Sequence, residues 1–168
     1  MLTIILETEN DEDRLARVLA PLVPAAMEGF LRDVVIVDRQ STDGTRVVAD
    51  VAGCTIVDVV PGRDDHLRRA VDEARGDWLL FLSVTSKPMS EGWQSAAFAA
   101  MTASRESGGR PAYLRRGRYA AGVVGRFFRL FGGCEGTLVS KAYWLSRAEQ
   151  LSASPAASSV SGARRGAA

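Results

Sequence analysis

The sequence has few of the residues that build disulfide-rich, metal-clustered or membrane-spanning proteins. It contains two cysteines and one histidine in 168 residues. Cys54 and Cys134 form no metal-binding or redox motif, and two cysteines are too few for a secreted disulfide framework. No segment reaches about 18 uninterrupted apolar residues, so a membrane-spanning helix is not expected. These shortages favour a protein of the reducing cytosol.

The first residues also lack the basic start and the long apolar stretch of a secretory signal peptide. The apolar run Leu2–Leu6 is followed at once by acidic side chains: Glu7, Glu9, Asp11, Glu12 and Asp13. We therefore expect a cytoplasmic protein.

The composition is that of a globular domain, but the charge is unevenly distributed. Hydrophobic residues make up 46% and charged residues 24%, and the length suits one α/β domain better than two. Residues 1–100 carry 17 acids and 10 bases, whereas residues 101–168 carry 3 acids and 11 bases. A split of this kind indicates a basic surface for an anionic partner.

Strand and helix patterns alternate along the first hundred residues. Four short apolar runs predict buried strands: Leu2–Leu6, Val34–Val37, Thr55–Val60 and Trp78–Leu82. Three helical patterns separate them: Asp11–Leu22, which Pro24 is expected to end, then Thr45–Val51 and Asp64–Ala74. Because each crossover between parallel strands needs a helix, this order predicts a parallel sheet with helices on both faces.

Ligands of such sheets bind at the carboxyl ends of the strands. Asp38 ends the second strand, and its carboxylate is suited to accept hydrogen bonds from an imide or a hydroxyl of a ligand. We expect its side chain to project into the crevice rather than the core; the alternative is that it caps the following turn. Asp43 precedes Gly44 at a helix start and is expected to be structural.

Four segments, in order, resemble the family 2 glycosyltransferases. Thr3–Glu12 is similar to the family's apolar strand followed by Pro-Thr-x-Asn-Glu, with Glu7 in place of proline. Ile36–Thr45 is similar to Val-Asp-Asp-Gly-Ser-Thr-Asp-Gly-Thr, with Arg39 and Gln40 departing from it. The other two segments are 62–77, similar to Gly-Arg-x-x-Gln and Ala-x-Gly-Asp, and Leu79–Leu82, followed by Pro88 and Gly92-Trp93.

The resemblance implies a Rossmann-like GT-A nucleotide-diphospho-sugar transferase fold, with a mostly parallel sheet and helices on both faces. It covers residues 2–100, the nucleotide-sugar-binding half of such enzymes. We expect one domain over residues 1–150, with the donor half at 1–100 and a short basic acceptor-side segment at 101–150. Residues 151–168, rich in Ser, Ala and Gly, are expected to form a disordered tail.

The family binds a divalent cation through an Asp-x-Asp at the end of the fourth strand. The matching positions here are Ser83-Val84-Thr85, whose hydroxyls cannot supply the missing negative charge. We therefore expect no divalent metal cofactor and weakened metal-assisted transfer. On this sequence the chain is either an active transferase or a degenerate, inactive member.

The resemblance and the strand-end rule together select the candidate nucleotide-sugar-binding residues. Arg39 could neutralise phosphate, with a plain surface arginine as the alternative. Arg63 matches a shared position, with a salt bridge to a nearby acid as the alternative. His66 is expected to be an isolated surface or pocket-rim side chain rather than a ligand. The full candidate set is Glu7, Asp38, Arg39, Arg63, Ser83 and Thr85.

A general base is needed to take the proton of the acceptor hydroxyl. Only three acids follow residue 100, and Glu135, flanked by glycines at 132, 133 and 136, is the candidate. The alternative is a solvated loop acid.

The segment Leu114–Phe131 combines five arginines with large apolar residues and no acid. Such a composition can lie at an anionic membrane surface; the alternative is a helix packed on the sheet with its arginines outward. No nucleic-acid-binding motif is present. The arginines of the predicted membrane contact are Arg115, Arg116, Arg118, Arg126 and Arg129.

Two functions therefore remain open at this stage. The first is a glycosyltransferase-like protein that binds a nucleotide-activated sugar and transfers it to a lipid or envelope-glycan acceptor. The second is a catalytically inactive member that serves as a sugar-nucleotide sensor or as a peripheral module at the inner face of the membrane.

Overall fold

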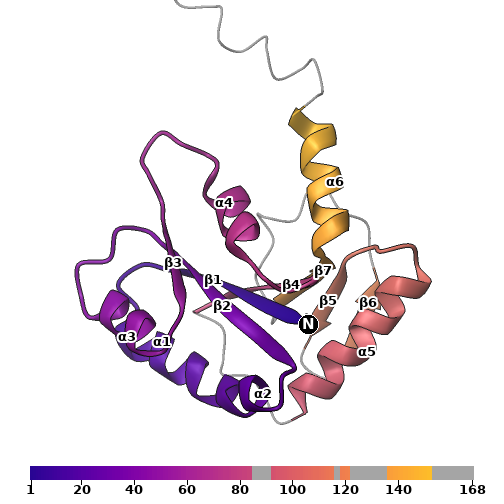
Figure 1. Cartoon of the computed structure of the whole chain (residues 1–168), viewed down its shortest axis with the longest axis horizontal. Coiled ribbons are helices and arrows are strands. Elements are labelled where there is room, and N and C mark those ends of the chain that lie inside the picture. The colour runs from indigo at the N-terminus through magenta and orange to yellow at the C-terminus, as the bar shows by residue number, and fades with distance from the viewer. Residues whose placement is uncertain (85–91, 116–117, 122–135, 153–168) are drawn as a thin grey trace, which may run out of the picture.

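The computed structural model describes residues 1–84, 92–115, 118–121 and 136–152 (Figure 1). Seven strands form one sheet in the order β3-β2-β1-β4-β7-β5-β6. The strands are β1 (Leu2–Thr8), β2 (Leu31–Asp38), β3 (Thr55–Asp58), β4 (Trp78–Ser83), β5 (Ala112–Arg115), β6 (Arg118–Ala121) and β7 (Gly136–Ser140).

The sheet is mostly parallel, as expected. β3, β2, β1 and β4 pair in parallel, β7 runs antiparallel to β4, and β5 and β6 continue the sheet in alternating directions. Five of the seven strands therefore point the same way. The Rossmann-like α/β fold predicted from the sequence is confirmed.

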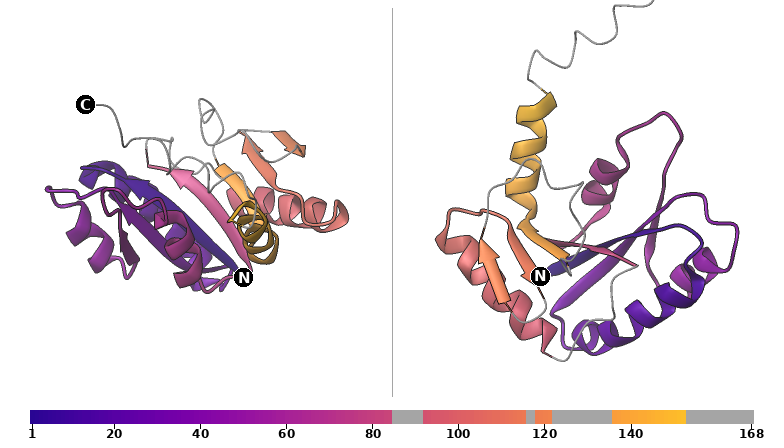
Figure 2. Two further views of the ribbon diagram at one scale, coloured as in Figure 1. Left: turned by 90° about the horizontal axis from the view of Figure 1, so that it is seen from above. Right: turned by 180° about the vertical axis from the view of Figure 1, so that it is seen from behind.

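Helices cover both faces of the sheet (Figure 1 and Figure 2). On one face, Ile4, Leu80 and alternate residues along the same strands pack against α1 (Glu12–Leu19), α2 (Val23–Met27), α3 (Thr45–Val51) and α5 (Trp93–Glu106). On the other, Ile5 and Leu79 pack against α4 (His66–Glu73) and α6 (Lys141–Ser152). Since successive strand residues point to opposite faces, continuously apolar strands are buried on both sides.

The helical path does not end before Pro24, contrary to the sequence-based expectation. It continues from α1 through the 3-10 turn η1 (Ala20–Leu22) into α2. Pro21 and Pro24 each lie at the first or second position of a new helical element, where the missing N–H leaves no hydrogen bond unmade. The path stops at Gly29, which has φ +74°.

The later part of the chain completes the sheet. Residues 136–152 form β7 and α6, and α6 includes Leu151 and Ser152, which were expected to belong to the disordered tail. Residues 153–168 of the predicted tail lie outside the described part of the chain.

The helix alternative for the basic segment is wrong for residues 114–115 and 118–121. β5 and β6 form an antiparallel hairpin there, with Arg115 opposite Arg118. β5 also pairs with β7, so the free edge of β7 offers the segment a strand partner that the sequence pattern did not reveal. Arg116, Arg126 and Arg129 lie outside the described residues.

None of the helices in the described part of the chain is long and apolar enough to span a membrane.

Candidate functional site

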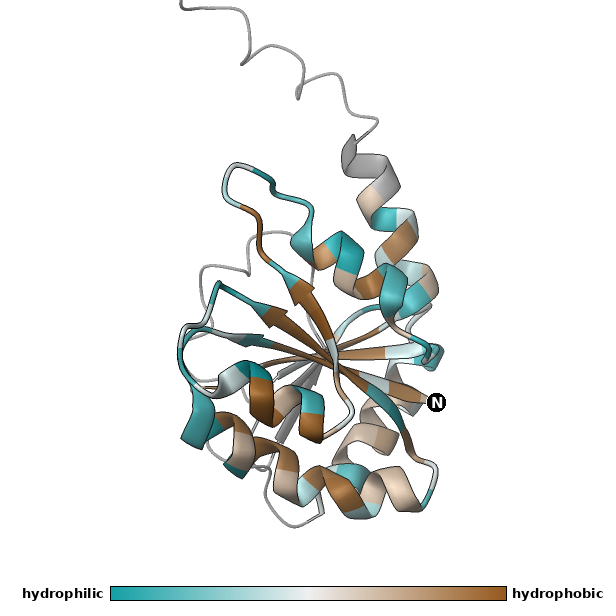
Figure 3. Cartoon of the chain, turned by 60° about the vertical axis from the view of Figure 1, so that its left-hand side comes forward, coloured by the Kyte–Doolittle hydropathy of each residue, from teal (hydrophilic) through white to brown (hydrophobic). Residues whose placement is uncertain are grey.

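Three candidate binding residues lie at one edge of the sheet because β1, β2 and β4 end in register. Glu7 on β1 lies opposite Ser83 on β4, and Thr8 lies opposite Asp38 on β2. Asp38 is in turn opposite Asp58 on β3. The loops after β1 and β2 are mainly hydrophilic, whereas the strands are mainly apolar (Figure 3). This carboxyl edge is where open α/β sheets bind ligands.

The Asp38 carboxylate is fully buried and holds the turn that follows it. It accepts hydrogen bonds from the Ser41 amide at 3.2 Å, from Ser41 Oγ at 2.5 Å and from Thr8 Oγ1 at 3.4 Å. It also forms an ion pair with Arg46 at 2.9 Å. The expectation that this side chain projects into the crevice is therefore wrong, because the fold's own donors surround it. A role for Asp38 in nucleotide binding stays a prediction.

Arg46 links two strand ends, and sequence reasoning missed it. Its guanidinium contacts both Asp38 and Asp58, and hydrogen bonds to Asp58 and then to Asp38 raise its pKa. The signal was available in the sequence. Arg46 lies in the first turn of α3, where the helix dipole disfavours a cation unless acidic side chains are close.

Glu7 and Arg39 form an ion pair with each other. Both residues depart from the family pattern, and both lie at this edge of the sheet. Arg39 Nη2 lies 2.9 Å from Glu7 Oε2, and the two side chains are 45% and 34% exposed. The backbone amide of Arg39 donates to the Thr8 carbonyl at 2.9 Å, which anchors the arginine beside the end of β1. The ion pair thus lies at the carboxyl edge of the sheet and is partly exposed.

The turns after β1 and β2 interlock beside this pair. The Asn10 amide donates to Ser41 Oγ at 2.9 Å, and Asn10 Oδ1 accepts the Thr42 amide at 2.8 Å. Both turns contain a non-glycine residue with positive φ, Asn10 at +53° and Gln40 at +58°. Strained backbone of this kind persists where the surrounding contacts hold it.

Asp43 serves the start of α3, as expected. Its Oδ1 accepts the Thr45 amide at 3.0 Å and Thr45 Oγ1 at 2.5 Å. The hydrogen bond from the Thr45 hydroxyl is the main cause that lowers the pKa of Asp43. Asp43 also borders an open cavity of about 420 Å³ between the two turns, lined by Asn10, Asp11, Glu12, Asp13, Arg14 and Asp43. Its acidic lining disfavours a diphosphate there.

Arg63 lies in the loop between β3 and α4. Its guanidinium forms an ion pair with Asp65, the alternative weighed for it, and this pairing lowers the pKa of Asp65. The Arg63 side chain is largely exposed, so it is accessible at this edge. His66 begins α4 and is half-buried.

Of the three remaining candidates, the described structure places only Ser83, at the strand edge with Glu7 and Asp38. Ser83 ends β4, whereas Thr85 and the candidate base Glu135 lie outside the described residues. Within residues 1–84, 92–115, 118–121 and 136–152, no group of three or more His, Cys, Asp or Glu side chains is arranged to hold a metal ion. These residues alone therefore do not make a metal site.

Comparison with solved structures identifies the fold. Glucosyl-3-phosphoglycerate synthase from Mycobacterium tuberculosis, in complex with Mn2+, UDP-glucose and phosphoglyceric acid, matches with a TM-score of 0.59 and 17% identity, over 84% of this chain and 57% of that one. Mannosyl-3-phosphoglycerate synthase from Rubrobacter xylanophilus matches with a TM-score of 0.61 and 19% identity, over 87% and 55%. The chain has the GT-A glycosyltransferase fold.

Sequence comparison points the same way. A glucosyl-3-phosphoglycerate synthase from Mycolicibacterium paratuberculosis (strain ATCC BAA-968 / K-10) is 25% identical over 104 residues, which cover 55% of this chain and 31% of that protein. No family model matches. This GT-A chain thus spans about a third of the curated relative and somewhat more than half of the solved structures.

The expectation of no divalent metal is wrong. Solved GT-A neighbours were crystallised with Mn2+ and UDP, including one in complex with glucosyl-3-phosphoglycerate. The expectation rested on Ser83-Val84-Thr85 alone, and a departure at one motif does not exclude an ion that substrate oxygens and other side chains also ligate.

Proposed function

We propose that this chain binds a uridine diphosphate sugar at the carboxyl edge of β1, β2 and β4 and acts in glycosyl transfer. The observation that carries the proposal is the GT-A fold, with Glu7, Arg39 and Ser83 at the edge where such sheets take their ligands. Solved structures of the same fold were crystallised with UDP or UDP-glucose, which makes uridine nucleotides the first donors to test.

In this proposal Arg39 changes partner when the nucleotide binds. Its guanidinium, paired with Glu7 in the structure, presents a planar set of donors that matches a diphosphate. Exchanging one exposed carboxylate for a doubly charged diphosphate strengthens the electrostatic interaction. Arg63, exposed in the loop after β3, is the second candidate donor to the diphosphate.

Transfer requires an acceptor hydroxyl that attacks the anomeric carbon while the bond to the diphosphate breaks and UDP departs. Glu135 remains the candidate that takes the hydroxyl proton. The acceptor predicted from the sequence is a lipid or an envelope glycan. Phosphoglyceric acid, present in solved structures of the same fold, is the small acceptor to test beside it.

Calorimetric titration of the full chain decides the donor. UDP and UDP-glucose should bind in the presence of Mn2+, and other nucleoside diphosphates should bind more weakly. A companion assay of UDP release, with each acceptor, separates an enzyme from a non-catalytic sugar-nucleotide sensor. Absence of binding heat for every nucleotide at millimolar concentration, with Mn2+ present, would overturn the proposal.

Replacing Arg39 with alanine should weaken UDP binding at least about tenfold, equivalent to about 1.4 kcal/mol. The free energy of unfolding of the Arg39→Ala variant should differ from that of the parent by less than about 1 kcal/mol, because a partly exposed ion pair contributes little. Arg68→Ala is the matched control, since Arg68 is also 45% exposed and also paired with an acid, Asp72. Equal UDP affinity in the two variants would remove Arg39 from the site.

The membrane hypothesis remains a separate proposal for a cytoplasmic protein at the inner face of the membrane. In its favour, the hairpin of β5 and β6 places the backbone of Arg115 opposite that of Arg118 at one end of the sheet. Co-sedimentation with anionic vesicles at low and high salt tests it, because screening weakens such attraction. A parent protein that stays in the supernatant at low salt would end this hypothesis.

A further inference from the structure

Glu7 and Ser83 lie side by side at the carboxyl edge of the sheet. They are partners in the parallel register of β1 and β4, and neighbouring strands lie about 4.8 Å apart. Ile5 and Phe81, two positions earlier, belong to the core under α4 and α6. Since strand side chains alternate between the two faces, Glu7 and Ser83 point to the same face as that core. Residues 78–83 of β4 include no acid, so β1 supplies the carboxylate at this place.

The Glu7 carboxylate differs from the other carboxylates at the strand ends. Asp38 and Asp58 lie on the opposite face of the sheet, where Arg46 of α3 pairs with both. Glu7 pairs instead with Arg39, and both side chains of this pair are partly exposed. An ion pair in contact with water contributes little to stability. Glu7 can therefore exchange its partner at little cost when a ligand arrives at the edge.

We propose that Glu7 supplies the protein carboxylate of a divalent-cation site that is complete only with the nucleotide bound. This inference rests on the proposed function, in which Arg39 leaves Glu7 for the diphosphate. Glu7 then lies beside a second anion without its own cation, and the like charges repel. A divalent cation held by Glu7 and by diphosphate oxygens replaces this repulsion with attraction, and such hard cations take oxygen ligands.

The charges and the number of ligands fit this arrangement. The pair of Glu7 and Arg39 is neutral, and a doubly charged diphosphate together with a divalent cation leaves the edge neutral. Mg2+ is usually held by one or two carboxylates, water and substrate phosphates, and Mn2+ takes the same oxygen ligands. A preformed cage is not required, and within the described ranges no three His, Cys, Asp or Glu side chains are arranged as one. The cation and the nucleotide should therefore bind together rather than singly.

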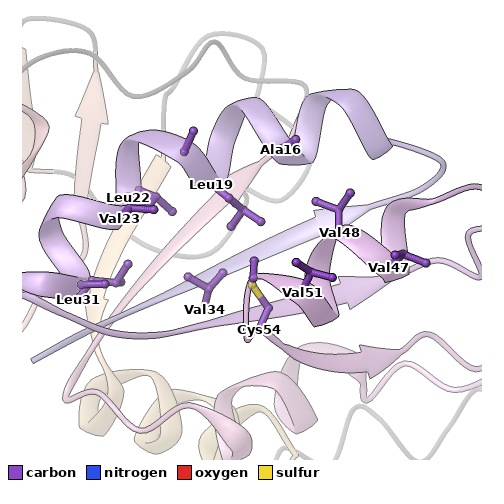
Figure 4. A pocket seen from close by; sticks show the side chains of 13 residues that line it. Ala16, Leu19, Leu22, Val23, Leu31, Val34, Val47, Val48, Val51 and Cys54 are labelled. Carbon is purple, nitrogen blue, oxygen red and sulfur yellow. The ribbon is translucent and has the colours of Figure 1, made fainter.

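Two other hollows of the described structure suit the cation less well. An apolar groove of about 470 Å³ between α1, α2 and α3 is lined by alanine, valine, leucine and Cys54, so its side chains offer no oxygen ligand (Figure 4). The open cavity of about 420 Å³ between the two turns has an acidic lining, but most of its acids already serve the fold. Glu12 and Asp43 accept backbone amides at the start of α3. Asp11 forms an ion pair with Arg14.

Glu7→Gln tests the inference by calorimetric titration of the full chain with UDP-glucose, in Mn2+ and in a chelator. In the parent, Mn2+ should tighten binding at least about tenfold. In Glu7→Gln this gain should fall below about threefold, because an uncharged amide is a poor ligand for a hard cation. Without metal, Glu7→Gln should bind about threefold more tightly than the parent, because Arg39 is already released and no carboxylate opposes the diphosphate. These two effects have opposite signs, which a loss of structure cannot produce.

Asp72→Asn is the matched control. Asp72 lies on α4 and pairs with Arg68, which is as exposed as Arg39. The control also removes one carboxylate from an exposed ion pair, and it should keep the parent's response to Mn2+. The electron paramagnetic resonance signal of free Mn2+ gives a second readout. Parent protein and UDP-glucose together should lower this signal by more than the sum of their separate effects, whereas Glu7→Gln should add no such excess.

Glu7→Cys separates direct ligation from attraction at a distance. A thiolate prefers Zn2+ to Mn2+, whereas a carboxylate accepts both. The ratio of the Zn2+ effect to the Mn2+ effect on UDP-glucose affinity should therefore be at least about tenfold higher in Glu7→Cys than in the parent. Cys54 and Cys134 are present in both proteins and cancel in this comparison. An unchanged ratio would show that Glu7 is not a ligand.

Failure of this inference differs from failure of the proposed function. An equal gain from Mn2+ in the parent and in Glu7→Gln would place the cation elsewhere and leave the proposed function intact. Loss of all UDP-glucose binding in Glu7→Gln, with the fold retained, would make Glu7 a contact of the nucleotide instead of the cation. A parent that binds no nucleotide, with or without Mn2+, would overturn both.

Discussion

Asp38→Ala should lower the free energy of unfolding by about 3 kcal/mol, because it removes a buried carboxylate that accepts several hydrogen bonds and pairs with the partly exposed Arg46. The substitution leaves the donors of Ser41 and Thr8 without their acceptor and removes one of the two carboxylates that hold Arg46. Chemical denaturation followed by circular dichroism measures the change. The stability of the Asp38→Ala variant must therefore be measured before any change in its nucleotide affinity is interpreted.

Asp58→Ala is the control for this experiment. Asp58 contacts the same guanidinium, but its side chain is 55% exposed, and the expected loss is below about 1 kcal/mol. An Asp38→Ala protein that is as stable as the parent but no longer binds UDP would make Asp38 a ligand for the nucleotide rather than an anchor of the turn.

Gly76→Ala should also lower the free energy of unfolding by about 3 kcal/mol, because the added methyl group has no room. A Cβ at this position would lie 2.7 Å from the Thr3 amide nitrogen and 2.8 Å from both the Leu2 carbonyl carbon and the Met1 oxygen. These are backbone atoms of β1 and its start, so they cannot rotate away as a side chain would. The Gly76 amide also donates to Thr3 Oγ1 at 2.8 Å, and this bond would be displaced. Thermal unfolding of the purified variant measures the effect.

Gly29→Ala separates this steric cost from the conformational cost of losing a glycine. Gly29 has φ +74°, but an added Cβ would meet no atom within 4 Å. Only the left-handed backbone conformation opposes the substitution, so Gly29→Ala should lower the free energy of unfolding by about 1 kcal/mol. If Gly29→Ala and Gly76→Ala lower the free energy of unfolding by the same amount, close packing at Gly76 does not explain the loss of stability in the Gly76→Ala variant.

The parallel part of the fold could be predicted from sequence because its strands are buried on both faces. Apart from Thr3, the runs Leu2–Leu6 and Trp78–Leu82 are apolar throughout, a pattern typical of parallel strands buried on both faces. The antiparallel extension was less visible. β5 pairs with the edge of β7, and β6 pairs with β5. The sequence of residues 112–121 does not show that the edge of β7 lies beside them.

The site was predictable in its location but not in its contacts. The strand-end rule selected Glu7, Asp38 and Ser83, which the structure places at one edge. It could not show that Asp38 is buried under Arg46, because that contact depends on where α3 returns over the sheet. The only indication of this contact in the local sequence was the position of Arg46, a cation in the first turn of α3.

The interlocked turns after β1 and β2 also bear on how the site can move. Besides the bonds of Asn10, the Asp11 amide donates to Thr45 Oγ1 at 2.8 Å and the Gly44 amide donates to Glu12 Oε2 at 3.1 Å. Neither turn can leave its place without breaking bonds to the other, so the two open together in a single cooperative unit. Amide hydrogen exchange at Asp11 and Gly44 should therefore proceed with the same opening free energy, and a ligand that touches only one turn would slow exchange in both.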